Sequence, residues 1–125
     1  MGNSLIAVID DDALVRAATT SLLRSMGYDC CDFASADAFL SDRDCRYDCV
    51  VSDIQMPGMS GIELAHVLKS LTPRPPVILI TAYPDARAIA AKTSGVASAL
   101  LEKPLDGDLF LAAVQSAIKS GSIEG

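Results

Sequence analysis

The sequence predicts a single α/β domain, built as a doubly wound open parallel sheet with helices on both faces. Five apolar runs of strand length alternate with five stretches of helical period along the 125 residues. Several of these runs are apolar throughout rather than alternating, which is typical of parallel strands covered on both faces. Right-handed crossovers bring the carboxyl ends of such strands to one edge of the sheet, where we expect the functional residues to gather.

The five strand candidates differ in strength. LIAVI at 5–9 and PVILIT at 76–81 are continuous apolar runs, whereas YDCCDF at 28–33 is weaker because polar residues interrupt it. The remaining two are CVVS at 49–52 and SALLE at 98–102. Each run is followed along the chain by a stretch with helical spacing, so the expected order is βα repeated five times.

Capping residues and an apolar stripe predict the first two helices. Asp11 or Asp12 can cap the start of the first helix, and Gly27 can end it. Ser35 opens a short second helix, SADAFL. The predicted stripe of the first helix consists of Leu14, Ala17, Ala18, Leu22 and Leu23.

The three later helices follow from similar signals. Ser60 and Glu63 form the pattern of a capping box ahead of the third helix, and the fourth is expected at about 85–93. Asp106 can cap the last helix. The residues that we expect to face the core are Ile62, Leu64, Ala65, Val67 and Leu68 in the third helix and Leu109, Ala113, Val114 and Ala117 in the fifth.

Charge and composition exclude several classes of function. The formal net charge is −6, which argues against direct binding to nucleic acid because that usually requires a basic face. Half of the residues are hydrophobic, yet no apolar stretch is long enough to cross a membrane. The segment 1–4 lacks the basic region of a signal peptide, so we expect a cytoplasmic protein.

Polar side chains follow four of the strands at the predicted functional edge. Asp10 and Asp11 follow the first strand, Asp53 follows the third, the fourth ends in Thr81, and the fifth runs into Lys103. Three clustered carboxylates repel one another unless a cation is present, and hard oxygen ligands suit Mg²⁺. The lysine and the threonine hydroxyl can both contact phosphoryl oxygens. This edge therefore has the groups that phosphoryl transfer requires.

Asp53 is the expected nucleophile of this site. It stands alone at a strand end, which leaves Asp10 and Asp11 as the adjacent pair that holds a metal. A carboxylate can accept a phosphoryl group as an acyl phosphate, while metal and lysine screen the charge on the oxygens. Pro57, Gly58 and Gly61 then form a turn that lets backbone groups approach the ion.

Four separated motifs resemble the receiver domain of two-component response regulators. SADAFL together with QMPGMSGIEL is most similar to the FixJ-like branch of that family. The resemblance implies a receiver domain over 1–119, with 120–125 as a C-terminal tail or the start of a linker. The motifs are VIDDD at 8–12, SDIQMPGMSGIEL at 52–64, LITA at 79–82 and LEKP at 101–104.

This resemblance implies a CheY-like, flavodoxin-like three-layer sandwich with strand order 2-1-3-4-5. It implies that a histidine kinase donates a phosphoryl group to Asp53 in a reaction that requires Mg²⁺, for which Mn²⁺ can substitute. Asp11 and Asp53 would bind the metal through carboxylates and Gln55 through its backbone carbonyl, with Asp10 acting through water. FixJ-like proteins commonly carry Arg at the position of Gln55.

The family's switch residues are only partly present. Thr81 and Lys103 would contact the phosphoryl group and draw the loop after the fourth strand inward, and the bond from Lys103 to Pro104 is usually cis in this family. The usual Tyr or Phe three residues before the lysine is here Leu100. Tyr83 either replaces it as the moving aromatic residue or is an exposed loop residue with no switching role.

The resemblance also implies a signalling domain rather than an enzyme, although one that assists its own phosphorylation and dephosphorylation. Phosphorylation would change the surface formed by the fourth helix, fifth strand and fifth helix, through which a homodimer forms or an output domain or effector is contacted. FixJ-like proteins typically carry a helix-turn-helix domain after a linker. We therefore expect transcription regulation through a domain outside this chain, with a stand-alone receiver as the alternative.

Two other functions stay open on the sequence. An aspartate-nucleophile hydrolase of the haloacid dehalogenase type requires a second aspartate at the position of Gln55 and a cap domain, for which the chain has no room. A pseudo-receiver would bind its partners without phosphorylation. The intact set of acidic, threonine and lysine residues weighs against a pseudo-receiver, whereas Leu100 keeps that alternative open.

Overall fold

The computed structural model describes residues 3–42, 46–71 and 74–124, the last five of them by their backbone only. Five parallel strands form one sheet in the order β2-β1-β3-β4-β5, which confirms the predicted fold class and strand order. The elements are β1 Leu5–Ile9, α1 Ala13–Ser25, β2 Asp29–Phe33, α2 Ala36–Ser41, β3 Cys49–Asp53, α3 Gly61–Lys69, β4 Val77–Thr81, α4 Ala86–Thr93, β5 Ala99–Glu102 and α5 Gly107–Glu124. None of these described helices is both long and apolar enough to cross a bilayer.

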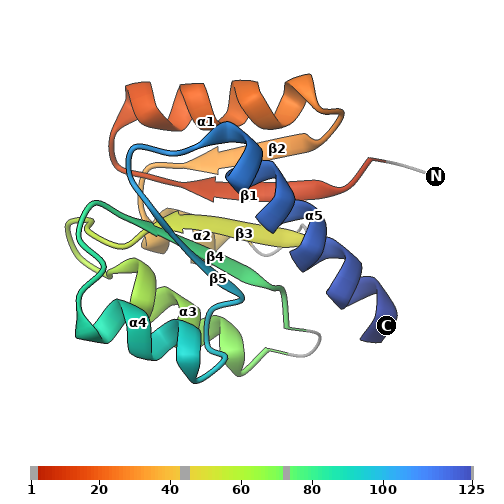
Figure 1. Cartoon of the computed structure of the whole chain (residues 1–125). Coiled ribbons are helices and arrows are strands. Elements are labelled where there is room, and N and C mark those ends of the chain that lie inside the picture. The colour runs from red at the N-terminus through yellow and green to blue at the C-terminus, as the bar shows by residue number, and fades with distance from the viewer. Residues whose placement is uncertain (1–2, 43–45, 72–73, 125) are drawn as a thin grey trace.

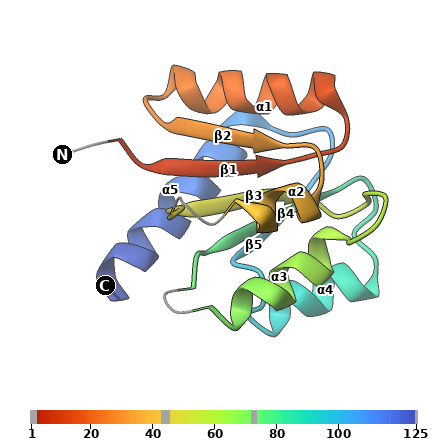
Figure 2. The ribbon, with the colours of Figure 1, turned by 180° about the vertical axis from the view of Figure 1, so that it is seen from behind.

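The sheet lies between two layers of helices, so that each face has a core of its own (Figures 1 and 2). On one face α2, α3 and α4 pack against alternate strand residues such as Ala7, Val50 and Leu79. On the other face α1 and α5 pack against the intervening residues, among them Val8 and Ile78. Because successive side chains of a strand point to opposite faces, an uninterrupted apolar run such as β4 supplies both cores.

The predicted helix caps are present in the structure. Asp12, rather than Asp11, caps α1, and its carboxylate accepts hydrogen bonds from the amides of Leu14 and Val15. Serine or aspartate side chains likewise cap the other helices, at Ser35, Ser60, Asp85 and Asp106. Each cap satisfies amide groups that the first helical turn leaves without partners.

The apolar stripe predicted for α1 is correct only at its C-terminal end. Leu23 is buried and Leu22 packs against the same core, as predicted, whereas Leu14, Ala17 and Ala18 are exposed. In their place, Thr19 and Thr20 are buried. Each threonine hydroxyl donates to a carbonyl one turn back in the same helix, at 2.9 and 3.0 Å. These local hydrogen bonds let the polar side chains be buried at little cost, and they allow a different face of the helix to pack on the sheet.

Two other core predictions need correction, and one boundary differs. Leu109 is 63% exposed and Val67 is 39% exposed, whereas the next residue of α5, Phe110, is fully buried in the core. The backbone of residues 120–124, predicted as a tail or linker, continues α5 to Glu124. The predicted strands otherwise agree with the observed ones to within one residue at either end.

Candidate functional site

Three carboxylates meet at the carboxyl-terminal edge of the sheet. The register pairs Ile9 of β1 with Ser52 of β3, so the next residues along these strands, Asp10 and Asp53, become neighbours. One carboxylate oxygen each from Asp10, Asp11 and Asp53 lies within 4.8 Å of the others. Asp10 and Asp53 are buried, whereas Asp11 is exposed. The predicted acidic cluster is therefore assembled by the pairing of β1 with β3.

This environment disfavours the ionised form of the two buried carboxyls. Burial raises the pKa of Asp10, an effect opposed by the amide of Asp12 and the charge of Lys103 and reinforced by Asp11. Burial also raises the pKa of Asp53, although the ammonium of Lys103 opposes it. A cation bound among the three carboxylates would remove much of this unfavourable energy.

Lys103 provides a positive charge beside Asp53. Its Nζ lies 3.2 Å from Oδ1 of Asp53, close enough for an ion pair. That contact lacks hydrogen-bond geometry, and Oδ1 is buried without a hydrogen-bond partner among the described residues. The amide of Lys103 donates to the carbonyl of Thr81 at 2.8 Å, which holds the lysine at this edge, and the bond to Pro104 is cis as expected. A buried anionic oxygen that accepts no hydrogen bond and lies among other carboxylate oxygens fits a divalent cation such as Mg²⁺.

Thr81 is fully buried at the end of β4, and its hydroxyl forms hydrogen bonds with Gln55 and Tyr83. The hydroxyl oxygen lies 3.1 Å from Oε1 of Gln55 and 3.2 Å from the carbonyl of Tyr83, and it accepts from the amide of Tyr83 at 3.1 Å. A hydroxyl has one proton, so the two acceptors share it. The hydrogen bond between Thr81 and the Gln55 side chain was not predicted.

The two candidate switch residues differ in their surroundings. The side chain of Tyr83 is 76% exposed, and only its backbone is tied to Thr81. Leu100 is half-buried and packs against the core beneath α2, α3 and α4. Leu100 therefore contributes to the apolar core. It has no polar group that could form a hydrogen bond after moving between a buried and an exposed position.

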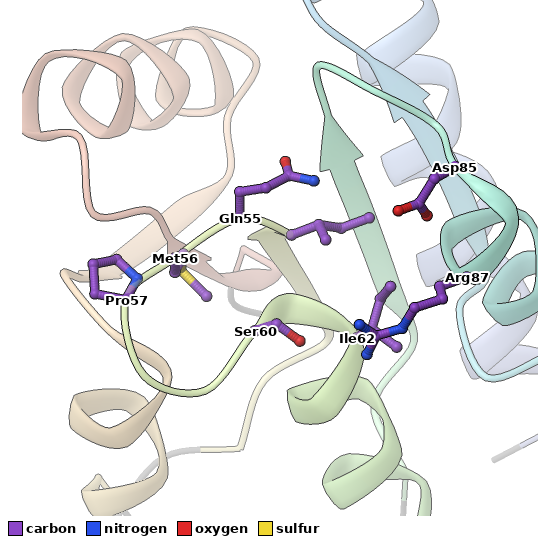
Figure 3. A pocket seen from close by; sticks show the side chains of 8 residues that line it. Gln55, Met56, Pro57, Ser60, Ile62, Asp85 and Arg87 are labelled. Carbon is purple, nitrogen blue, oxygen red and sulfur yellow. The ribbon is translucent and has the colours of Figure 1, made fainter.

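A cavity of about 400 Å³ lies beside the loop that follows β3 (Figure 3). It is bounded by the loop after β3 and by the start of α4, and Gln55, Ser60, Asp85 and Arg87 are among its lining residues. None of the three clustered aspartates is among the residues that line this cavity.

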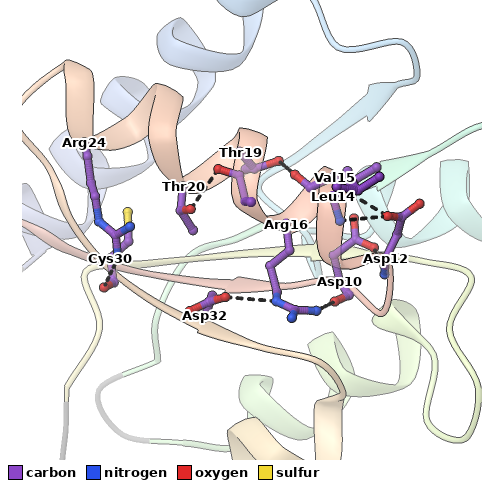
Figure 4. Close-up of polar contacts among 11 residues, drawn as sticks. Asp10, Asp12, Leu14, Val15, Arg16, Thr19, Thr20, Arg24, Cys30 and Asp32 are labelled. Carbon is purple, nitrogen blue, oxygen red and sulfur yellow. Dashed lines mark hydrogen bonds and ion pairs between the residues drawn. The ribbon is translucent and has the colours of Figure 1, made fainter.

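Arg16 contacts the acidic edge from α1 and was not predicted from the sequence. Its Nη1 donates to the backbone carbonyl of Asp10 at 2.7 Å, and its Nε donates to Oδ2 of Asp32 in β2 at 2.9 Å (Figure 4). Sequence spacing gives no signal for this arrangement, because Asp32 follows Arg16 by 16 positions and belongs to a different element.

The sequence was compared with protein-family models and with known proteins. A family model described as "Response regulator receiver domain" matches residues 6–115. The transcriptional regulatory protein FixJ of Bradyrhizobium diazoefficiens is 39% identical over 116 residues, which are 91% of this chain and 56% of that protein. TdiR of Thauera aromatica is 37% identical over 116 residues, which are 92% of the chain and 51% of the relative. The chain thus spans about half the length of these curated relatives.

Solved structures agree at the level of the fold. A full-length FixJ structure from B. japonicum superimposes with a TM-score of 0.86 at 35% identity and covers 97% of this chain and 60% of that one. A CheY-like receiver domain protein from Methanospirillum hungatei gives a TM-score of 0.91 over 99% of this chain and all of its own. Its identity is 24%, so that likeness bears on the fold only.

Proposed function

The chain belongs to the family of response regulator receiver domains, and from this premise we propose that Asp53 accepts a phosphoryl group from a histidine kinase in a reaction that requires Mg²⁺. One observation carries the proposal. The buried Asp53 carboxylate lies 3.2 Å from the ammonium of Lys103 and within 4.8 Å of the oxygens of Asp10 and Asp11. A nucleophile, a fixed cation and a pair of metal ligands are therefore within reach of one incoming phosphoryl group.

The residues that would hold the metal are those at the acidic edge. In this proposal the carboxylates of Asp11 and Asp53 and the backbone carbonyl of Gln55 bind Mg²⁺, while Asp10 acts through water. The Asp53 oxygen that accepts no hydrogen bond and the raised pKa values of Asp10 and Asp53 support this donor set. When bound, the ion supplies positive charge that offsets the charge on the phosphoryl oxygens. Mn²⁺ accepts the same hard oxygen ligands and can substitute.

The transfer itself requires little from the chain beyond positioning and charge. An ionised oxygen of Asp53 attacks phosphorus, and the O–P bond forms as the bond from phosphorus to the donor's imidazole nitrogen breaks. The leaving nitrogen retains the bonding electron pair. Asp53 reacts as the carboxylate and therefore has no proton to lose. Lys103 faces the reacting carboxylate and would neutralise a phosphoryl oxygen as the acyl phosphate forms.

The response would begin at Thr81. To donate to a phosphoryl oxygen, its hydroxyl proton must leave Gln55 and the carbonyl of Tyr83, and this movement would pull the turn after β4 and the start of α4. The face formed by α4, β5 and α5 would then change. Exposed Ile89 of α4 and Leu109 of α5 support a role for this face in homodimer formation or in contact with an output domain or effector.

At the level of the whole protein, we propose a cytoplasmic regulator in which residues 1–119 form the receiver. The output would be transcription, through a domain outside these residues, as the name of the FixJ relative suggests. A pseudo-receiver is the competing function, and Leu100 in place of an aromatic switch residue is the observation in its favour. Chemical phosphorylation distinguishes the two.

The test is intact-mass spectrometry after incubation with acetyl phosphate, with and without Mg²⁺. We expect wild type to gain the mass of one phosphoryl group only when Mg²⁺ is present, and Asp53→Asn to gain none. Asp29→Asn is the matched control because it removes an exposed carboxylate at the opposite end of the sheet, and it should be phosphorylated like wild type. An equal adduct in Asp53→Asn would refute the assignment of the nucleophile. Absence of an adduct in every sample would favour the pseudo-receiver.

A further inference from the structure

We propose that Arg16 and Asp32 are positioning residues for the metal site, forming a clasp between α1 and β2 that fixes the backbone from which Asp10 and Asp11 project. The clasp consists of two hydrogen bonds from one guanidinium, to the Asp10 carbonyl at 2.7 Å and to the Asp32 carboxylate at 2.9 Å (Figure 4). This inference rests on the metal site of the proposed function and adds residues that would not touch the ion.

The clasp acts on the peptide group between the two acidic residues. A peptide group is planar, so a guanidinium that holds the carbonyl of Asp10 also sets the direction of the Asp11 amide and the position of its Cα. The amide of Asp10 is held as well, since it donates to the carbonyl of Phe33 in β2 at 3.1 Å. Two links therefore connect the backbone of Asp10 to the end of β2. Its amide bonds directly to Phe33, and its carbonyl accepts from Arg16, which also bonds to Asp32.

The geometry of Arg16 suits a fixed contact rather than a mobile surface charge. Its side chain is only 19% exposed, whereas that of Asp32 is 45% exposed. A planar guanidinium that donates from two nitrogens in fixed directions loses little additional freedom on making the second bond. The Asp32 carboxylate thereby orients the guanidinium of Arg16, and the guanidinium in turn orients the backbone at Asp10 and Asp11.

This loop needs an external support because its own charges repel one another. Asp10, Asp11 and Asp53 place three carboxylate oxygens within 4.8 Å, and Asp11 is exposed on the loop. One internal contact helps, since the amide of Asp12 donates to Oδ1 of Asp10 at 2.9 Å. That contact orients Asp10 but not Asp11, whose direction depends on the peptide that Arg16 holds.

If Arg16 is removed, a purely electrostatic role and a positioning role predict opposite changes in Mg²⁺ affinity. Removal of a positive charge beside a cation site should strengthen Mg²⁺ binding by simple electrostatics. Loss of the clasp should weaken binding, because supports outside the ligand shell typically contribute tenfold or more to metal affinity. A weaker affinity after removal of the arginine therefore cannot be attributed to its charge.

The experiment measures Mg²⁺ affinity of the unphosphorylated chain by isothermal titration calorimetry, with thermal unfolding of each variant alongside. We expect Arg16→Met to bind Mg²⁺ about tenfold more weakly than wild type. The matched control is Arg24→Met, which removes the same charge from the same helix and a similar contact, at 3.3 Å, to the carbonyl of Cys30 in β2. Because Arg24 lies at the end of α1 remote from Asp10, this control should bind within about twofold of wild type.

A folded Arg16→Met protein that binds Mg²⁺ as tightly as wild type, or more tightly, overturns the clasp while leaving the proposed function intact. If that variant does not unfold cooperatively, Asp32→Ala decides, because the exposed carboxylate can be removed without opening the core. Its control is Asp29→Ala at the opposite end of β2, and equal affinities of the two variants would overturn the clasp. Wild type that binds no Mg²⁺ would refute the metal site of the proposed function, and the clasp with it.

Discussion

At the scale of single residues, Gly61 sets how closely α3 approaches the end of β3, where Asp53 lies. A β-carbon at Gly61 would overlap the carbonyl oxygen of Asp53 and lie 3.0 Å from its carbonyl carbon. The amide of Gly61 also donates to the carbonyl of Ile54 at 3.0 Å, which draws the start of the helix against the end of β3. Glycine is therefore required at position 61 because the start of α3 lies directly against the backbone of Asp53.

We expect Gly61→Ala to displace the backbone of Asp53, lower the free energy of unfolding by about 1–3 kcal/mol and slow phosphorylation by acetyl phosphate. Gly107→Ala is the control, because a β-carbon there meets nothing nearer than 3.9 Å and would raise helix propensity at the start of α5. Urea unfolding and the rate of adduct formation measure the two effects. Equal stability and equal rates in both variants would contradict this account.

At the scale of one element, α3 begins with a complete capping box. The amide of Ser60 donates to the carboxylate of Glu63 at 3.0 Å, and the amide of Glu63 donates to the Ser60 hydroxyl oxygen at 3.1 Å. These bonds keep the start of α3 in place behind the loop that follows Asp53. The hydrogen bond from the backbone of Ser60 lowers the pKa of Glu63 below its usual value.

This lowered pKa predicts a pH dependence of stability. A carboxyl whose pKa falls on folding stabilises the fold above its unfolded pKa, and this contribution is lost as the pH falls through the lower folded pKa. Glu63→Ala should therefore be less stable than wild type at neutral pH, and the difference should shrink in acid. Urea unfolding of both proteins at neutral and acidic pH measures this difference in stability.

Ser60→Ala separates the capping role of Glu63 from its other effects. This variant should lower the free energy of unfolding by about 1 kcal/mol. The double variant, with both Ser60 and Glu63 replaced by Ala, should lose less stability than the sum of the two single variants, because the residues share one capping box. Strict additivity, or a difference for Glu63→Ala that does not change with pH, would contradict the capping role.

At the scale of the whole molecule, the strand order brings distant parts of the chain to one edge. The loops after β1 and β3 are adjacent because these strands pair, and the end of β4 and the residues after β5 complete the site. The buried carboxyls of Asp10 and Asp53 have raised pKa values, so their ionisation opposes folding as the pH rises through those values. A bound divalent ion should relieve this cost for the folded state only.

We therefore expect Mg²⁺ to raise the unfolding temperature of the wild-type chain. At a free concentration one hundred times the dissociation constant, the gain in the free energy of unfolding should be about 2.7 kcal/mol. Asp11→Asn should gain far less, whereas Asp37→Asn, a change at an exposed residue of α2, should behave like wild type. Thermal unfolding with MgCl₂ and with NaCl at equal ionic strength tests this, and an equal gain in all three proteins would indicate a nonspecific salt effect.

The sequence by itself determined the order of the elements, most of the caps and the edge where the acidic residues gather. These features depend on signals carried by neighbours along the chain, such as the Ser60 and Glu63 capping box and the continuous apolar run of β4. The positions of Asp10, Asp53 and Lys103 followed from one topological rule, that parallel strands present their carboxyl ends together. The resemblance to receiver domains supplied the strand order, which the structure confirmed.

Only the tertiary structure decided which faces of the helices are buried and which side chains meet across elements. It turned Leu14 of α1 toward solvent and buried Thr19, because internal hydrogen bonds made the threonine easy to bury. It also joined Thr81 to Gln55 and Arg16 to Asp32, pairs separated by 26 and 16 positions. Such contacts have no local signal, since they depend on packing that forms only when the layers assemble around the sheet.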